Sequence, residues 1–142
     1  MPIDNTIDII INLAYNHPSL EPPKIPDNLL KQLLQICTKE SPFMTPDERI
    51  FKQIDGVAMG SPLGPTFANF YMGYLEEIVF SNQNIKPFIY GRYVDDIFIM
   101  YSTIEQLEEV KKSFENNSIL KFTIEHIMDN KLTFLDILTT KN

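Results

Sequence analysis

The sequence predicts an α+β domain in which an antiparallel sheet is covered by helices on one face. Apolar residues at helical spacing alternate along the chain with pairs of short β-branched and aromatic runs. Turn residues separate the two runs of each pair, so the paired strands are expected to be antiparallel. The resulting order, α, α, ββ, α, ββ, α, ββ, and the lack of an internal repeat favour one α+β domain.

Composition agrees with one soluble globular domain: 142 residues, of which 44% are hydrophobic and 22% charged. Twelve basic and nineteen acidic side chains give a net charge of −7, which argues against a self-sufficient nucleic-acid binder. The chain lacks both the roughly 18–20 apolar residues of a membrane span and a signal-peptide pattern. We expect an intracellular protein, nuclear or cytoplasmic, that is not secreted. The single cysteine, Cys37, agrees with a reducing compartment.

Two helices are predicted in the N-terminal part, at residues 4–15 and from Asp27 onward. The first has Asp4 or Asn5 as its N-cap, although its many isoleucines also suit a strand. Prolines within residues 17–26 exclude a continuous helix between the two. The second helix is expected to pack on a sheet through an apolar side that comprises Leu29, Leu30, Leu33, Leu34 and Cys37.

A hairpin, a glycine-proline loop and a long helix are predicted next. The hairpin has strands at residues 43–44 and 50–54 around a turn at 45–48. Three glycines and two prolines within residues 56–65, here called the glycine-proline loop, exclude regular structure and let backbone approach a ligand closely. The helix, residues 65–79, starts on a proline, and its apolar stripe comprises Phe67, Phe70, Tyr71, Tyr74, Leu75 and Ile78.

Residues 90–101 contain the most unusual turn of the chain. Apolar runs flank Asp95 and Asp96, which predicts two strands joined by a two-residue acidic turn. Such turns favour Asn-Gly or Gly-Gly, because their central residues need positive φ, and two adjacent carboxylates repel each other. A divalent cation such as Mg²⁺ or Mn²⁺ relieves that repulsion, whereas the alternative is a plain exposed acidic turn.

A helix and a further hairpin are predicted at the C-terminal end. A capping box at residues 102–105 opens the helix, and an Asn-Asn pair at 116–117 ends it. Strands at 121–127 and 132–138 follow, around a turn at 128–131. The inward positions of the helix are Ile104, Leu107, Val110 and Phe114.

Two of these stretches together resemble the reverse transcriptases. Gly56-Val57-Ala58-Met59-Gly60-Ser61-Pro62-Leu63 resembles their template- and nucleotide-contacting motif B, and Tyr93-Val94-Asp95-Asp96 resembles their metal-binding motif C. The motif B wording, Arg92-Tyr93-Val94-Asp95-Asp96 and Leu132-Thr133-Phe134-Leu135-Asp136 are most similar to Penelope-like retroelement reverse transcriptases. The resemblance extends from Pro2 to about Leu138 and implies the palm of a right-hand polymerase.

The resemblance implies a two-metal nucleotidyl-transfer site. Asp95 is the expected ligand of Mg²⁺ or Mn²⁺, and Asp96 is a secondary candidate that modulates the site or the primer end. Two ions about 4 Å apart activate the primer 3′-hydroxyl and stabilise the leaving pyrophosphate. The implied partners are an RNA template, a DNA primer and a deoxynucleoside triphosphate.

The resemblance also implies contacts with template and nucleotide from one loop. The contacting residues of that loop are Gly56, Met59, Gly60, Ser61 and Pro62. The last three shape the floor beneath the incoming nucleotide, where a side chain at Gly60 is expected to clash. Gln53 either hydrogen-bonds the template or is an exposed strand residue.

Two further sites follow from the resemblance near the C-terminus. Phe134-Leu135-Asp136 resembles the primer grip, or else forms part of a core hairpin. Lys121 lies where motif D is expected, either as a general acid toward pyrophosphate or as an ordinary strand-edge lysine.

One part of the family pattern is not matched. The family has a further metal-binding Asp in motif A, and residues 1–10 resemble the segment just after that motif, so neither Asp4 nor Asp8 takes its place. Fingers and thumb are also unmatched. Residues 1–142 are therefore expected to be a truncated palm that is inactive alone and self-associates through an exposed sheet edge.

Three interpretations follow from these residues. The chain is a fragment of a reverse transcriptase, a non-enzymatic binding or scaffolding domain derived from a retroelement palm, or an unrelated α+β metal enzyme. The third needs further acidic ligands, for which Asp55 and Asp136 are the reserves. The first needs the acidic turn and the glycine-proline loop to face each other across one shared cleft.

Overall fold

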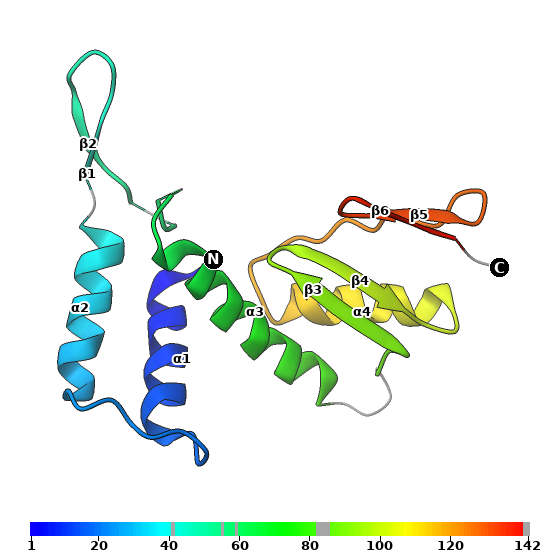
Figure 1. Ribbon diagram of the computed structural model, residues 1–142, viewed down its shortest axis with the longest axis horizontal. Coiled ribbons are helices and arrows are strands. Elements are labelled where there is room, and N and C mark those ends of the chain that lie inside the picture. Colours follow the sequence, from blue (N-terminus) through cyan, green and yellow to red (C-terminus); the bar gives the residue numbers. More distant parts are fainter. Residues whose placement is uncertain (41, 55, 59, 82–85, 141–142) are drawn as a thin grey trace. The chain divides into compact units, whose positions relative to one another are not determined.

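The computed structural model describes residues 1–40, 42–54, 56–58, 60–81 and 86–140. The chain divides into two compact units, Met1–Tyr74 and Leu75–Asn142, with the helix α3 (Leu63–Phe80) running across the boundary (Figure 1). Every strand pair in the described residues is antiparallel, which confirms the predicted α+β class. The strands form three separate two-stranded sheets, whereas one sheet covered by helices was predicted. Each described strand forms a hairpin with a strand next to it in sequence, and no backbone ladder joins one described hairpin to another.

The first unit begins with two helices close to their predicted positions. Helix α1 (Ile3–Asn16) has Pro2 as its N-cap, in place of Asp4 or Asn5, and the hydroxyl of Thr6 donates to the carbonyl of Pro2 at 2.8 Å. Helix α2 (Asp27–Lys39) follows Pro26 as N-cap, and its first residue accepts a hydrogen bond from the next backbone N–H at 2.7 Å. The helical prediction for the isoleucine-rich segment is confirmed.

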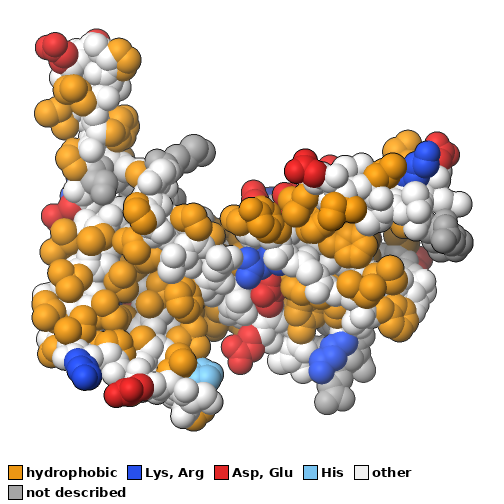
Figure 2. All heavy atoms as spheres, viewed as in Figure 1, with side chains coloured by type: hydrophobic (Ala, Val, Ile, Leu, Met, Phe, Trp, Pro, Cys, Tyr) orange, Lys and Arg blue, Asp and Glu red, His pale blue; other side chains and the backbone are white. Residues whose placement is uncertain are grey.

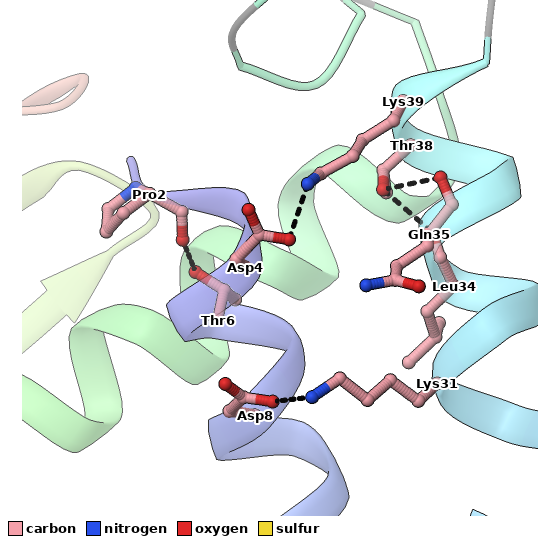
Figure 3. Close-up of polar contacts among 9 residues, drawn as sticks. All are labelled: Pro2, Asp4, Thr6, Asp8, Lys31, Leu34, Gln35, Thr38 and Lys39. Atoms are coloured by element: carbon pink, nitrogen blue, oxygen red, sulfur yellow. Dashed lines mark hydrogen bonds and ion pairs between the residues drawn. The ribbon is translucent and has the colours of Figure 1, made fainter. Parts of the chain in front are cut away.

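Helix α2 packs against α1, so the prediction that it packs on a sheet was wrong. Ion pairs join Lys31 to Asp8 and Lys39 to Asp4 across the two helices (Figure 3). The face toward α1 includes the buried Thr38, whose hydroxyl donates to the carbonyl of Leu34 at 2.7 Å. The predicted stripe is therefore split: its members Leu29, Leu33 and Cys37 are exposed, and so is Ile36, which was not predicted to belong to it. Apolar side chains gather on the surface of this part of the chain (Figure 2).

The core of the first unit joins α1 to the beginning of α3. Ile3 and Ile7 of α1 and Phe67 of α3 are buried together. Half-buried apolar residues that pack around them are Met1, Ile10, Ile11, Leu34, Val57 and Leu63. Because Val57 belongs to the glycine-proline loop, this core also fixes one end of that loop.

The predicted hairpin after α2 is confirmed. Strands β1 (Pro42–Met44) and β2 (Ile50–Lys52) pair with Phe43 opposite Phe51, and their rings stack with centroids 5.8 Å apart. The hairpin extends away from α1 and α2, and all residues of its two strands are exposed (Figure 1). Its apolar side chains therefore add to the exposed apolar surface of the first unit.

The second unit packs the last turns of α3 against α4 (Ile104–Asn116). Its buried residues include Leu75 and Val79 from α3, and Val110 and Phe114 from α4. Phe80 contacts Phe114 edge to face at 5.9 Å between ring centroids. Helix α4 ends where predicted, but Thr103, not Ser102, is its N-cap.

The predicted stripe of α3 is only partly correct. The helix begins at Leu63, two residues before the predicted start at Pro65. Phe70 and Tyr74 are exposed, at 36% and 40%, while Met72 and Val79 are buried. The stripe is broken because the two halves of α3 belong to different units and serve different cores.

The C-terminal hairpin lies further along the chain than predicted. Residues 121–127 form no strand, although the turn at 128–131 is confirmed by a bridge between Met128 and Lys131. Strands β5 (Lys131–Phe134) and β6 (Ile137–Thr140) instead pair around a turn at Leu135 and Asp136. The predicted strand 132–138 is thus two strands. None of the helices that the structure describes is long and apolar enough to span a membrane.

Candidate functional site

The acidic turn joins β3 (Ile89–Tyr93) to β4 (Asp96–Met100) in the second unit. Tyr93 pairs with Asp96, so the two central residues of the turn are Val94 and Asp95. The predicted turn, with Asp95 and Asp96 at its centre, was therefore wrong by one residue. Both carboxylates belong to exposed residues.

Val94 takes the unusual conformation that the turn requires. Its φ is +54°, in the left-handed region. A β-branched side chain is strained there, and strain of this kind persists where the surrounding structure enforces it. The turn that carries Asp95 is therefore held by contacts outside its own two residues.

A half-buried polar cluster supplies such contacts. The guanidinium of Arg92, on β3, donates through Nη1 to the carbonyl of Val94 at 3.0 Å and through Nε to Glu76 of α3. The same Glu76 oxygen accepts a hydrogen bond from the hydroxyl of Tyr90 at 2.6 Å. The ring of Tyr90 meets Phe80 at 4.9 Å, so the cluster is attached to the apolar core of this unit.

The pKa values of this cluster reflect its burial and charge. Burial raises the pKa of Tyr90, and the adjacent Glu76 carboxylate raises it further. For Arg92, burial lowers the pKa, but the hydrogen bond and charge of Glu76 outweigh burial and raise it overall. The raised pKa keeps Tyr90 protonated, so its hydroxyl can donate to Glu76.

The sequence analysis missed Glu76, Tyr90 and Arg92. A usable signal is present: Tyr90 and Arg92 are two residues apart on one strand, so they share a face of the hairpin. An arginine on a packed face needs charged or hydrogen-bonding partners, because burial of an uncompensated charge is unfavourable. Sequence alone does not say which acidic residue provides it.

The glycine-proline loop lies in the first unit, between β2 and α3. Gly56 and Gly60 have φ of +76° and +87°, which glycine adopts without strain. The N–H of Ser61 donates to the carbonyl of Ala58 at 3.0 Å, and its hydroxyl accepts from the N–H of Leu63 at 3.3 Å. The loop is thus a folded turn that leads into α3.

The predicted contact residues in and before this loop differ in exposure. Gly60 and Pro62 are exposed, whereas Gly56 and Ser61 are half-buried. Gln53 is also half-buried, one residue beyond the end of β2, and its Nε2 lies 3.3 Å from where a Cβ on Gly56 would be. Met59 and Asp55 lie outside the described residues.

The other predicted site residues lie in the second unit. Phe134 of β5 contacts Phe98 of β4 edge to face, with ring centroids 5.6 Å apart. Leu135 and Asp136 are exposed at the turn that follows. Lys121 is exposed in a segment that is not a strand, so it is not a strand-edge residue.

The donor set at the acidic turn fits a partial metal site. Among the described residues there is no group of three or more His, Cys, Asp or Glu that could hold a metal ion. Mg²⁺ keeps several waters and is commonly held by one or two carboxylates together with substrate phosphates. Asp95 and Asp96 meet that requirement, provided that other ligands complete the shell.

The structure groups the predicted residues by unit. Asp95, Asp96, Lys121 and the segment 134–136 belong to the second unit, and the described residues of the glycine-proline loop belong to the first. A cleft shared by the acidic turn and that loop stays a prediction.

Comparison with known proteins gave one match. The family model described as reverse transcriptase (RNA-dependent DNA polymerase) matches residues 11–135. Neither the curated proteins nor the solved structures gave a match. The matched range contains the acidic turn, the polar cluster beneath it and the glycine-proline loop.

Proposed function

Because the chain belongs to the reverse transcriptase family, we propose that residues 1–142 form part of a polymerase palm, closest to the Penelope-like retroelement enzymes. In this proposal Asp95 and Asp96 hold Mg²⁺ or Mn²⁺ for nucleotidyl transfer. Family membership supports an RNA-directed DNA polymerase that binds template and primer.

The observation that carries the proposal is the construction of the acidic turn. Two adjacent carboxylates are exposed at the tip of a hairpin whose strained residue, Val94, is held from below by Arg92. An ordinary surface turn has no need of such support. Bound divalent ions would lower the pKa of the primer 3′-hydroxyl and neutralise charge on the leaving pyrophosphate.

The glycine-proline loop is proposed to contact template and incoming nucleotide. Its described members with this role are Gly56, Gly60, Ser61 and Pro62, joined by Gln53, and Met59 completes the set. A Cβ at Gly60 meets no described residue within 4 Å apart from its chain neighbours, which leaves space over this residue for a ligand. At the other end of the chain, Phe134, Leu135 and Asp136 are proposed to contact the primer, and Lys121 to protonate pyrophosphate.

The site is proposed to need a carboxylate in addition to Asp95 and Asp96. The described residues offer no third acidic ligand beside them. The net charge of −7 also leaves few basic side chains to neutralise nucleic-acid phosphates. We therefore expect negligible primer extension by the 142 residues alone, and Asp95-dependent extension by the purified chain would contradict this.

Binding of Mn²⁺ to the chain tests the metal site directly. Paramagnetic Mn²⁺ broadens NMR signals near its site, so titration should broaden the backbone amide signals of Asp95 and Asp96 first. Asp95→Asn should weaken this binding at least tenfold, because a hard cation loses an anionic ligand.

Asp136→Asn is the matched control, because Asp136 occupies the same position in the turn between β5 and β6. It should leave Mn²⁺ binding unchanged. Equal losses in both variants would favour the unrelated metal enzyme, which uses Asp136 as a ligand. An unaffected Asp95→Asn variant would remove the metal site from the proposal.

A further inference from the structure

We propose that Glu76 and Arg92 are positioning residues that hold the Val94–Asp95 turn in its strained conformation and so set the direction of the two carboxylates. The effect on the turn stands on the geometry of the second unit alone. Its consequence for metal binding rests on the proposed function. Arg92 belongs to one of the strings that carry the resemblance, but the resemblance gave neither residue a role.

The first step is the contact between Arg92 and the turn. Nη1 of Arg92 donates to the carbonyl of Val94 at 3.0 Å, and Val94 is the residue with φ of +54°. This carbonyl belongs to the peptide that links Val94 to Asp95. A charged donor on that oxygen favours the one peptide orientation that the turn needs.

The second step is the contact that orients Arg92 itself. Its Nε donates to Glu76, so the planar guanidinium is held on one side by α3 and reaches the turn on the other. The Glu76 and Arg92 side chains are 20% and 13% exposed. The side chains of the other three ion pairs in the described residues are at least 40% exposed. Low exposure makes this pair the one that is least screened by solvent.

The third step is the attachment of Glu76 to the core. Glu76 follows the buried Leu75 in α3 and lies three residues before the buried Val79, and it also accepts a hydrogen bond from the hydroxyl of Tyr90. The rigid helix therefore fixes the carboxylate, which fixes the guanidinium, which fixes the turn. The hydroxyl of Tyr90 also interacts with Arg92, so it supports both members of the pair, but the hydrogen bond to the turn comes from Arg92.

The other acidic hairpin provides an internal comparison. Leu135 has φ of +53° at the same turn position, and Asp136 follows it as Asp95 follows Val94. There the hydroxyl of Thr139 donates to the carbonyl of Leu132 at 2.6 Å, away from the turn. Among the described residues, a charged side chain thus supports the turn carbonyl in the β3–β4 hairpin, and this is the hairpin that carries the proposed metal ligands Asp95 and Asp96.

NMR of the full 142-residue chain can test the inference in two independent readouts. The three-bond coupling between the amide and α protons of Val94 reports its φ, and Mn²⁺ broadening at Asp95 reports metal affinity. The variants are Glu76→Gln and Arg92→Lys. The second keeps the positive charge but loses the fork that reaches two partners at once.

Both variants should shift the Val94 coupling and weaken Mn²⁺ binding by about tenfold, the lower end of what loss of a supporting group costs a metal site. Tyr90→Phe is the matched control: it removes the hydroxyl that interacts with Glu76 and Arg92 but leaves the Arg92–Val94 hydrogen bond in place, and it should change Mn²⁺ affinity less than about twofold. The Leu135 coupling should stay constant in all three and shows that the unit is folded.

The outcomes separate this inference from the proposed function. An unchanged Val94 coupling in both Glu76→Gln and Arg92→Lys overturns the positioning role, whatever the affinity for Mn²⁺. If the wild-type chain shows no Mn²⁺ effect at Asp95 while the variants still shift the Val94 coupling, the metal site fails and the positioning role stands. If one variant does not fold, the other decides.

Discussion

Phe98 of β4 and Phe134 of β5 meet edge to face, with ring centroids 5.6 Å apart and ring planes at 61°. This contact links the hairpin that carries Asp95 to the hairpin that carries Asp136, two strand pairs that share no backbone ladder in the described residues. Side chains, not sheet hydrogen bonds, therefore join the two acidic hairpins.

Loss of this ring contact should destabilise the second unit. Phe134→Leu should lower the free energy of unfolding by about 1 kcal/mol, because the ring is half-buried and the volume change is small. Urea unfolding followed by circular dichroism measures it. A double-mutant cycle with Phe98→Leu should give a coupling energy of about 0.5–1.5 kcal/mol. Strictly additive effects would show that the rings do not interact in solution.

Stability should fall in alkaline solution because two tyrosines are protonated more strongly in the folded state. Burial, then the charge of Glu109, raises the pKa of Tyr101 to about 12, and burial raises that of Tyr90. Both exceed the value of about 10 for an unfolded tyrosine. Their stabilisation is therefore complete below about pH 10 and is lost as pH rises through the folded values.

Urea unfolding at pH 8, 10 and 11 measures this loss. We expect about 1 kcal/mol from Tyr101 once solvent screening is allowed for. Tyr101→Phe should flatten the pH dependence, and so should Tyr90→Phe, because each removes a tyrosine whose pKa is raised in the folded state. Identical slopes in the wild type and both variants would contradict the assignment.

Substitution by alanine should change stability in opposite directions at two glycines. Gly60 has φ of +87°, so Gly60→Ala should cost about 1–2 kcal/mol of stability through backbone strain alone, since nothing lies within 4 Å of the added Cβ. Gly73 lies within α3 with equally open space, so Gly73→Ala should stabilise the chain by about 0.5–1 kcal/mol. Thermal unfolding of the two variants compares the signs. Stabilisation by Gly60→Ala would show that the loop adopts another backbone conformation.

The apolar face of α2 should promote self-association. Leu33 and Ile36 are 46% and 54% exposed, and the neighbouring hairpin adds Phe43 and Ile50, at 51% and 74% (Figure 2). Exposed apolar surface of this extent is typical of an interaction site or of aggregation. Leu33→Lys should shift sedimentation velocity profiles toward the monomer. Gln32→Lys adds the same charge one residue away and should not, and equal effects of the two would attribute the change to charge.

The helices could be predicted from the sequence because their signals are local. The apolar spacing and the capping box at residues 102–105 predicted the start of α4 to within one residue. The turn residues 45–48 predicted the position of the first hairpin. The prolines before α2 likewise fixed its start. Where capping, periodicity and turn chemistry agree, an element needs no tertiary contact to be recognised.

The errors arise where tertiary contacts decide. The acidic turn was predicted one residue too late, because the apolar runs on both sides of Asp95 and Asp96 assigned Val94 to a strand. In the structure Val94 is a turn residue with positive φ, and Arg92 donates to its carbonyl. The partner of α2 could not be predicted either, because a stripe of leucines fits a helix and a sheet equally well. The position of the glycine-proline loop in the chain was recognised, but its hydrogen bonds through Ser61 depend on the start of α3.

The pairing of each described strand with its neighbour in sequence has a kinetic consequence. None of the three hairpins has to wait for a distant segment to arrive before its ladder forms, because each closes over a few residues. Chains of this kind have low contact order and fold on fast timescales, with hairpins forming in about 1–10 μs. During synthesis each hairpin can therefore form as soon as its own residues have emerged, from the N-terminal hairpin onward, and docking of side chains such as Phe98 and Phe134 becomes the slower event.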